Sequence, residues 1–263
     1  MISANCKIEA KDLPLGPGVR LISTNMHGLV AVDKPAGLMS HPNKPGDVSR
    51  SLLTAEYNYE GEFYSWKING SEQRVWLINR LDSPTSGLLL LALNAEMNKI
   101  IKRLFSTHSV RKTYYALVRQ SPLPAVGMWK DLLKEDIYYK IKRTKVGQRL
   151  LAHTNYEVVN ESAKGRQIVL LKLMPITGRT HQLRIQCKNH KHPIVGDRTY
   201  GDFGFNRKIA SATGQKRLML HSAEIAVHYS YQGNKYDFYA KSALPDAFAK
   251  ILQFNAGMSP RST

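Results

Sequence analysis

The fold is decided by one stretch of the chain, Leu77-Ile78-Asn79-Arg80-Leu81-Asp82-Ser83-Pro84-Thr85-Ser86-Gly87-Leu88-Leu89-Leu90-Leu91-Ala92-Leu93. A short apolar run leads into a turn with one basic and one acidic residue, and an unbroken apolar run follows. Such a run, bounded by Ser, Pro and Gly, predicts a strand buried on both faces. Asp82 is therefore expected on a loop at the edge of a rigid core, where reactive groups are commonly presented. Arg80 leaves an extended backbone on the same side, but an exposed ion pair worth at most about 1 kcal/mol fits this spacing equally well.

Four stretches in a fixed order carry a resemblance to one family. The motif Arg80-Leu81-Asp82-x-x-Thr85-Ser86-Gly87 resembles the central motif of the RluA-type pseudouridine synthases. Three others resemble that family's Lys-Pro-x-Gly turn, its Lys-x-Tyr-x-Ala-x-Val strand and its last signature. They are Leu29-Val30-Ala31-Val32-Asp33-Lys34-Pro35-Ala36-Gly37-Leu38 with Ser40-His41-Pro42, then Lys112-Thr113-Tyr114-Tyr115-Ala116-Leu117-Val118, then Pro175-Ile176-Thr177-Gly178-Arg179-Thr180-His181-Gln182-Leu183-Arg184 with His192-Pro193-Ile194-Val195-Gly196-Asp197. The resemblance implies an isomerase that modifies RNA.

The charge balance indicates the kind of partner. The chain carries 38 Lys and Arg against 20 Asp and Glu, a formal net charge of +18. Such a field attracts polyanions, so nucleic acid is the expected partner and its binding should be sensitive to salt. An acidic membrane surface is the second candidate, but the sequence has no basic amphipathic helix with an aromatic face. The choice of RNA over DNA comes from the resemblance, because charge does not distinguish them.

The remaining composition favours a cytoplasmic protein that does not cross a membrane. No apolar run approaches the length of a membrane span, and the first 28 residues contain no secretory signal. The two cysteines, Cys6 and Cys187, are too few for a disulfide framework. We expect a monomer without an obligate protein partner.

Residue patterns predict an α+β fold with a mixed, mostly antiparallel central sheet flanked by helices. The resemblance adds an active-site cleft across that sheet. Strands are expected at residues 29–32, 113–118, 156–159, 168–173, 218–220, 223–228 and 236–240. Helices are expected near 51–57, after an Asn94 cap, and from 180 to 190, with a polar loop at 202–217. The expected organisation is an extended arm (1–20), a catalytic domain (21–255) and a tail (256–263).

The resemblance also implies catalytic roles. Asp82 matches a nucleophile that would form a covalent intermediate, by attack on either the ribose or the uracil. Burial opposes an ionised carboxylate, and a guanidinium offsets that cost better than an ammonium. Arg184 matches this partner, although it is alternatively a helix residue that contacts phosphate. Tyr114 matches a tyrosine whose ring stacks on the uracil and whose hydroxyl assists loss of the proton from carbon 5. Tyr115 is expected in the core.

Other residues are expected to contact RNA. The target nucleotide must be flipped out of its stack, and the family's arginine before Leu-Asp, here Arg80, fills the vacated space. Basic residues in 138–149 have a second interpretation, since lysines also protect exposed sheet edges. His181 is alternatively a buried structural hydrogen-bonding residue. The full set of expected contacts is Arg80, Thr85, Arg179, His181, Lys140, Lys142 and Arg143.

Two local features leave questions open. Asn79 stands where many relatives have His before Arg-Leu-Asp, and an amide cannot titrate as imidazole does. We expect this position to be structural, because the rest of the motif is intact: Arg80, Asp82, Thr85, Ser86 and Gly87. The aromatic residues of 57–66 are expected to pack in the core and in a lid over it, with stacking on bases as the alternative. They are Tyr57, Tyr59, Phe63, Tyr64 and Trp66.

No metal or cofactor is expected, because neither His-Glu-x-x-His nor Cys-x-x-Cys occurs. The competing functions are a non-catalytic RNA-binding or RNA-folding protein on the same fold, and a metal-dependent nuclease. Transfer RNA or ribosomal RNA is the expected substrate. Residues 196–221 are similar to the branch that acts on transfer RNA.

Overall fold

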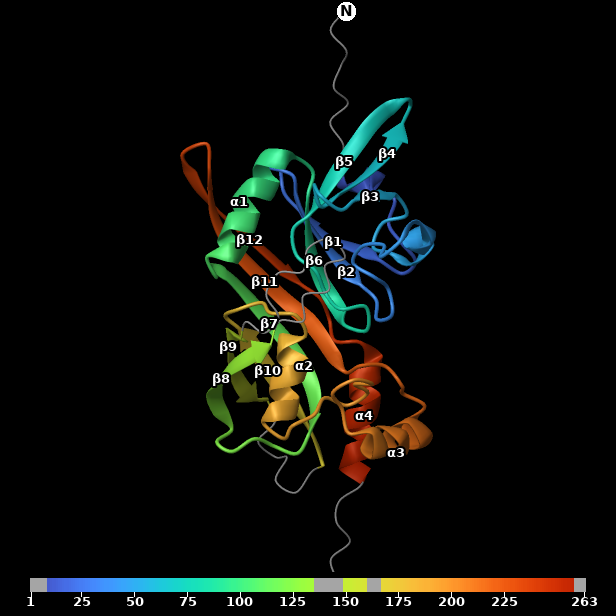
Figure 1. Ribbon diagram of the computed structural model, residues 1–263, viewed down its shortest axis with the longest axis vertical. Helices are drawn as coiled ribbons and strands as arrows, with labels where there is room; N and C mark the ends of the chain where they lie inside the picture. Colours follow the sequence, from blue (N-terminus) through green and yellow to red (C-terminus); the bar gives the residue numbers. More distant parts are fainter. Residues whose placement is uncertain (1–8, 135–148, 160–166, 258–263) are drawn as a thin grey trace, which may run out of the picture. The chain divides into compact units, whose positions relative to one another are not determined.

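The structure is a computed structural model that describes residues 9–134, 149–159 and 167–257 (Figure 1). The chain divides into two compact units. Unit 1 comprises residues 1–110 and 224–242, and unit 2 comprises residues 111–223 and 243–263. Strands outnumber helices in both units, and the strand pairs within each are antiparallel, which confirms the predicted α+β class.

Unit 1 contains an antiparallel sheet in the order β1-β2-β6-β5-β4-β3. It also holds helix α1 and the hairpin of β11 and β12, whose first residues, 220–223, belong to unit 2. The bounds are β1 (Arg20–Thr24), β2 (Leu29–Lys34), β3 (Glu56–Asn58), β4 (Phe63–Ile68), β5 (Ser71–Leu77), β6 (Ser86–Ala92), α1 (Ala95–Ser106), β11 (Leu220–Tyr231) and β12 (Asn234–Lys241), with 3-10 helices η1 (Ala10–Asp12) and η2 (Pro45–Arg50).

The core of unit 1 forms around the two most apolar strands. Every residue of β2 and of β6 is buried, as the unbroken apolar run predicts. Helix α1 covers this core with Met97 and Ile101, which are fully buried. Its first turn is capped by the Asn94 side chain, whose oxygen accepts a hydrogen bond from the Met97 N–H at 2.8 Å. The predicted cap and helix are thus confirmed.

The described residues of unit 2 form an antiparallel sheet in the order β7-β10-β9-β8, together with helices α2, α3 and α4. Helix α2 contacts β8, and α4 contacts both α3 and β10. The strands expected at 156–159 and 168–173 lie in β9 and β10, which pair with each other, with Leu171 opposite Val158. The bounds are β7 (Val110–Arg119), β8 (Val126–Lys134), β9 (Arg149–Val158), β10 (Ile168–Pro175), α2 (Gln182–Asn189), α3 (Phe203–Thr213) and α4 (Asp246–Gly257).

Three local predictions are wrong. Residues 51–57 are not helical, because Tyr57 pairs with Tyr64 in the sheet and the helical turn, η2, ends before them. Residues 202–217 contain helix α3, which the Asp202 side chain caps by accepting from the Phe205 N–H at 2.8 Å. The strands expected at 218–220 and 223–228 are parts of one strand, β11.

The described part of the predicted arm, residues 9–20, packs on unit 1. Leu13 is buried, and Leu15 forms a β-bridge with Leu53. None of the described helices is both long and apolar enough for a membrane crossing.

Candidate active site

Asp82 lies on the turn between β5 and β6, partly exposed to solvent. The Thr85 N–H donates to the Asp82 carbonyl at 3.0 Å and closes the turn. The Thr85 side chain is buried rather than displayed. A second strand end approaches this turn, because the Gly37 N–H donates to the Ser83 carbonyl at 2.8 Å and the Ser83 hydroxyl donates to the Gly37 carbonyl at 3.0 Å. The Lys-Pro-x-Gly turn and the Asp82 turn are therefore tied together.

A fully buried lysine reinforces this tie. The Lys34 ammonium donates to the carbonyls of Pro35 at 3.0 Å, Leu38 at 2.7 Å and Ser83 at 3.0 Å. An ammonium group has three N–H donors, so these three carbonyls can use all of them. Because the acceptors lie on two turns, Lys34 links the 35–38 turn to the backbone next to Asp82.

Ser40 makes a further link. Its hydroxyl donates to the Leu81 carbonyl at 2.7 Å and accepts from the Leu81 N–H at 3.0 Å. The Tyr64 hydroxyl in turn donates to the Ser40 carbonyl at 2.7 Å. Lys34, Ser40 and Tyr64 were not among the predicted site residues. Lys34 and Ser40 lie in the stretch that resembles the family's opening turn, and this was the signal that would have found them.

Asn79 has a structural role, as expected. Its side-chain oxygen accepts from the Leu90 N–H at 2.8 Å, and the Ile78 N–H donates to the Leu90 carbonyl at 3.0 Å. These contacts hold the segment before Arg80 against β6. No proton transfer is needed for this role, so the amide of Asn79 can fill it.

Arg80 is half-exposed next to the turn. Its Nη1 lies 3.5 Å from the His41 Nε2 and 4.0 Å from a carboxylate oxygen of Glu62. Glu62 also pairs closely with Lys102 of α1. The guanidinium is thus placed beside Asp82 in sequence but held by other partners, with its outer part open to solvent.

The predicted residues of unit 2 gather around α2. Arg184 forms a buried two-point ion pair with Asp197, from Nε to Oδ2 at 2.8 Å and from Nη2 to Oδ1 at 3.0 Å. The Arg184 guanidinium also lies 5.1 Å from the centre of the Tyr200 ring. His181 takes a left-handed conformation before α2, with φ +52°, and its Nδ1 lies 3.0 Å from the Tyr200 hydroxyl. Arg179 donates from Nε to the Leu151 carbonyl at 3.3 Å.

Burial and hydrogen bonding shift the pKa of Asp197 in opposite directions. Burial raises the pKa of Asp197, but hydrogen bonds from Arg184 and from the N–H groups of Tyr200 and Thr199 lower it by more, so the pKa lies below its ordinary value. Asp197 is therefore ionised when Arg184 is in place. The sequence placed Asp197 in the last signature without a role, and the structure assigns it to Arg184.

Strand β7 carries Tyr114 and its neighbours. Tyr114 is 9% exposed, whereas Tyr115 is partly exposed opposite Lys172, so the expectation of Tyr115 in the core is wrong. Strand alternation places the two rings on opposite faces, and the better covered face is that of Tyr114. Burial also lowers the pKa of Lys112 to about 8.

Asp82 and Arg80 belong to unit 1, whereas Tyr114, Arg179, His181 and Arg184 belong to unit 2. The pairing of Asp82 with Arg184 therefore stays a prediction. Lys140, Lys142 and Arg143 lie outside the described residues, and so does their expected contact with RNA. Among the residues that the structure describes, no group of three His, Cys, Asp or Glu side chains could hold a metal ion.

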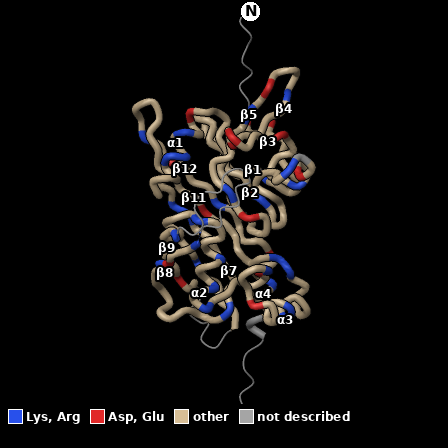
Figure 2. The backbone as a smooth tube through the Cα atoms, in the orientation of Figure 1, with Lys and Arg blue, Asp and Glu red and all other residues tan. Residues whose placement is uncertain are grey.

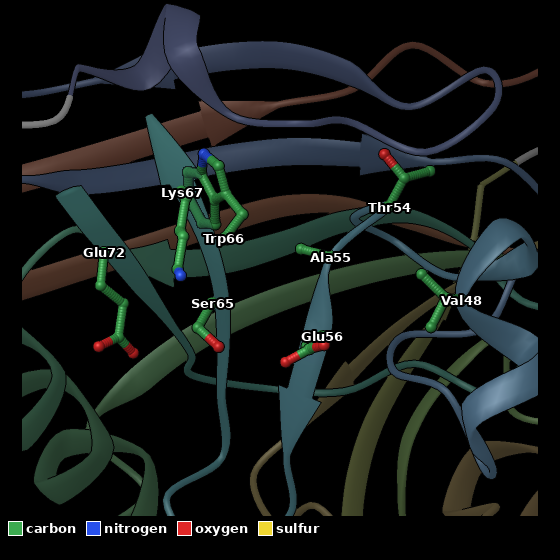
Figure 3. Close-up of a pocket in the computed structure, with 8 residues that line it drawn as sticks. All are labelled: Val48, Thr54, Ala55, Glu56, Ser65, Trp66, Lys67 and Glu72. Atoms are coloured by element: carbon green, nitrogen blue, oxygen red, sulfur yellow. The ribbon is translucent and has the colours of Figure 1, made fainter. Parts of the chain in front are cut away.

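A separate cavity of about 450 Å³ lies at β3, β4 and β5 (Figure 3). Carboxylates from β3 and β5 and an ammonium from β4 line it together with an indole ring. None of the predicted site residues is among the described residues that form its wall. These are Val48, Thr54, Ala55, Glu56, Ser65, Trp66, Lys67 and Glu72.

Comparison with known proteins agrees with the motifs. The family model described as RNA pseudouridylate synthase matches residues 28–189. A tRNA pseudouridine synthase C of Haemophilus ducreyi is 36% identical over 203 residues, which is 74% of this chain and 79% of the relative. The dual-specificity RNA pseudouridine synthase RluA of Escherichia coli is 29% identical over 241 residues, which is 89% of this chain and 97% of the relative.

A solved structure shares the fold. Human RNA Pseudouridylate Synthase Domain Containing 4 superposes with a TM-score of 0.64 at 24% identity, covering 88% of this chain and 91% of that one. The family model covers more than half of the chain, and the bacterial relatives align along most of their own length. The chain therefore belongs to the RNA pseudouridylate synthase family, of the RluA type, and is an isomerase that converts uridine in RNA to pseudouridine.

Proposed function

We propose that this chain modifies uridine in transfer RNA, with Asp82 as the nucleophile, Arg184 as the cationic partner and Tyr114 beside the uracil. Several relatives with 34–36% identity are named tRNA pseudouridine synthase C, which supports transfer RNA as the substrate. Ribosomal RNA is the second candidate, and the RluA relatives, which are named dual-specificity RNA pseudouridine synthases, are consistent with a second RNA substrate. A monomeric state and a cytoplasmic location stay predictions.

The reaction needs no redox change. The bond between ribose carbon 1′ and uracil nitrogen 1 breaks, and a bond between carbon 1′ and uracil carbon 5 forms. The proton on carbon 5 leaves, and nitrogen 1 gains a proton, so atoms and charges balance. A carboxylate nucleophile divides this exchange into easier steps through a covalent intermediate. The attacked atom is either a ribose carbon or a uracil carbon, and both fit the residues at hand.

The observation that carries this proposal is the rigidity of the Asp82 turn. The turn is held by Lys34 through Ser83, by Ser40 through Leu81, and by its own Thr85 N–H. A surface aspartate in an ordinary turn would not need a fully buried ammonium beneath it. Preorganisation of this kind supports a reactive role, because a nucleophile must be held close to its productive geometry.

The test maps pseudouridine in unmodified transfer RNA transcripts after incubation with the wild-type chain and with Asp82→Asn. We expect new pseudouridines with the wild type and none with the variant, while both bind the transcripts with similar affinity. A non-catalytic RNA-binding protein would give no pseudouridine with either chain. Modification only of ribosomal RNA transcripts would overturn the substrate but not the chemistry.

A further inference from the structure

Three aromatic side chains form an ordered group in unit 1. The rings of His41 and Tyr57 are stacked, with centroids 4.9 Å apart and planes 10° from parallel. The Tyr59 ring stands nearly perpendicular to both, with centroids at 5.3 Å from Tyr57 and 6.2 Å from His41. Tyr64, which is fully buried, supports Tyr57 from the core at 4.8 Å. We call His41, Tyr57 and Tyr59 the aromatic stack.

Hydrogen bonds link the aromatic stack to the Asp82 turn. Ser40, the residue before His41, exchanges two hydrogen bonds with Leu81, the residue before Asp82. Tyr64, which supports the stack, donates to the Ser40 carbonyl. The chain therefore fixes the start of the stack and the proposed nucleophile relative to each other, within one unit and through short tethers.

The stack is open on its outer side. Tyr59 is 51% exposed, whereas the Tyr64 ring beneath the stack is completely covered. Core packing therefore accounts for the position of Tyr64. It does not account for Tyr59, which contacts the His41 and Tyr57 rings and is still half-exposed to solvent. Large aromatic side chains that lie fixed and exposed beside a cation provide a surface on which nucleobases stack.

One cation lies at the stack. Arg80 is half-exposed next to His41, and Lys102 pairs with Glu62. Glu56 and Glu60, which flank the two tyrosines in sequence, are exposed, so the positive charge at the stack is that of Arg80. The Nδ1 of His41 faces the Pro42 carbonyl at 3.0 Å and must donate to it, because a carbonyl only accepts. In the neutral ring, Nε2 is then an acceptor directed at Arg80. Burial, followed by the charge of Arg80, lowers the pKa of His41 despite its hydrogen bond to Pro42, which agrees with a neutral ring.

We propose that the aromatic stack binds the base of a nucleotide next to the target uridine. When the uridine is flipped out, its neighbours lose a stacking partner, and Tyr59 with His41 and Tyr57 would replace it. The position of this base, next to the target uridine, rests on the proposed role of Asp82 as the nucleophile. The stacking of a base on the three rings does not depend on catalysis.

The experiment measures RNA affinity and the single-turnover rate of pseudouridine formation for Tyr59→Ala, with unmodified transfer RNA transcripts as the probe. We expect the dissociation constant to rise about tenfold, as is usual for loss of one stacked base. The slope of affinity against salt should not change, because no phosphate contact is removed. Tyr59→Phe should bind like the wild type, and Tyr59→Leu, which keeps apolar volume without a π face, should bind like the alanine variant.

The matched control is Tyr239→Ala on β12, since Tyr239 is 55% exposed in the same unit. It should leave affinity within twofold of the wild type. Equal affinity of Tyr59→Ala and wild type would overturn the inference, as would equal binding by the Leu and Phe variants. A transcript that lacks the base on one side of the modified uridine should no longer distinguish Tyr59→Ala from wild type.

The two proposals can fail separately. If the wild type makes no pseudouridine but Tyr59→Ala still weakens binding, the stacking site stands and the proposed function falls. If Asp82→Asn abolishes modification and Tyr59→Ala changes nothing, the proposed function stands and the stacking site falls. If every abasic transcript still responds to Tyr59→Ala, the stacked base is not adjacent to the target.

Discussion

Lys34 shows how one residue fixes the site. Its ammonium is fully buried and donates to three carbonyls on the two turns beside Asp82. Lys34→Met would leave these acceptors without their donor, at a cost of about 3 kcal/mol in the free energy of unfolding. The loosened turn should also lower the rate of modification. Urea denaturation and single-turnover kinetics measure both effects.

The control for Lys34 is Lys67→Met, because Lys67 is exposed on β4. Its effect on unfolding should stay within about 0.5 kcal/mol. Equal stability of the two variants would mean that the three carbonyls find water or other donors, and the tie between the turns would then be unimportant.

Asp197 predicts a dependence on pH. Its pKa in the folded chain lies below the ordinary value, because hydrogen bonds from Arg184 and two N–H groups outweigh the effect of burial. A lowered pKa gives stability that is present above the unfolded pKa of about 3.9 and is lost as the pH falls through the folded value. Asp197→Asn should be less stable at pH 7 and should lose less stability than wild type below about pH 4. Parallel stability curves from pH 7 to pH 3 would contradict this account.

At the scale of elements, Gly196 lies in the connection between α2 and α3, in a backbone conformation that favours glycine. Its φ is +78°, and an added Cβ would lie 1.8 Å from the Arg217 carbonyl oxygen. Gly196→Ala should cost more than about 2 kcal/mol in the free energy of unfolding. Gly214→Ala is the matched control, because Gly214 has φ +72° but open space around it. It should cost about 1 kcal/mol. Similar losses by chemical denaturation would show that the backbone near Gly196 relaxes.

The elements also show what the sequence could predict. Strand β6 and helix α1 follow from an apolar run and from helical spacing after a capping residue, both of which are local signals. Helix α3 also has local signals, namely the Asp202 cap, the buried Phe205 and Ile209 four residues apart and the left-handed Gly214 at its end, but the prediction of a polar loop did not use them. Residues 56–58 form a strand because of pairing with β4, which depends on contacts across a turn rather than on propensity.

In the candidate site, too, local features could be predicted and contacts between distant parts of the chain could not. The Asp82 turn was predicted from the Ser, Pro and Gly residues beside an apolar run. The supports of that turn were not, because Lys34 and Ser40 come from more than 40 residues earlier in the chain. Tyr59 was expected in the core with Tyr64, but it is 51% exposed, whereas Tyr64 is fully buried.

At the scale of the whole molecule, charge governs RNA binding. The net charge is +18, and Lys and Arg are spread over both units (Figure 2). We expect affinity for transfer RNA transcripts to fall by about 10³-fold or more between 50 and 200 mM salt, as for proteins that neutralise six or more phosphates. Filter binding over this range provides the slope. Affinity that barely changes with salt would mean that binding relies on base contacts instead of the phosphate backbone.

The most direct measurement is release of tritium from transfer RNA transcripts labelled at uracil carbon 5, for wild type and Asp82→Asn at equal RNA occupancy. We expect the wild type to release tritium as carbon 5 loses its proton, and the variant to release none above background while it still binds the RNA. Release by Asp82→Asn at the wild-type rate would contradict the assignment of Asp82 as the nucleophile.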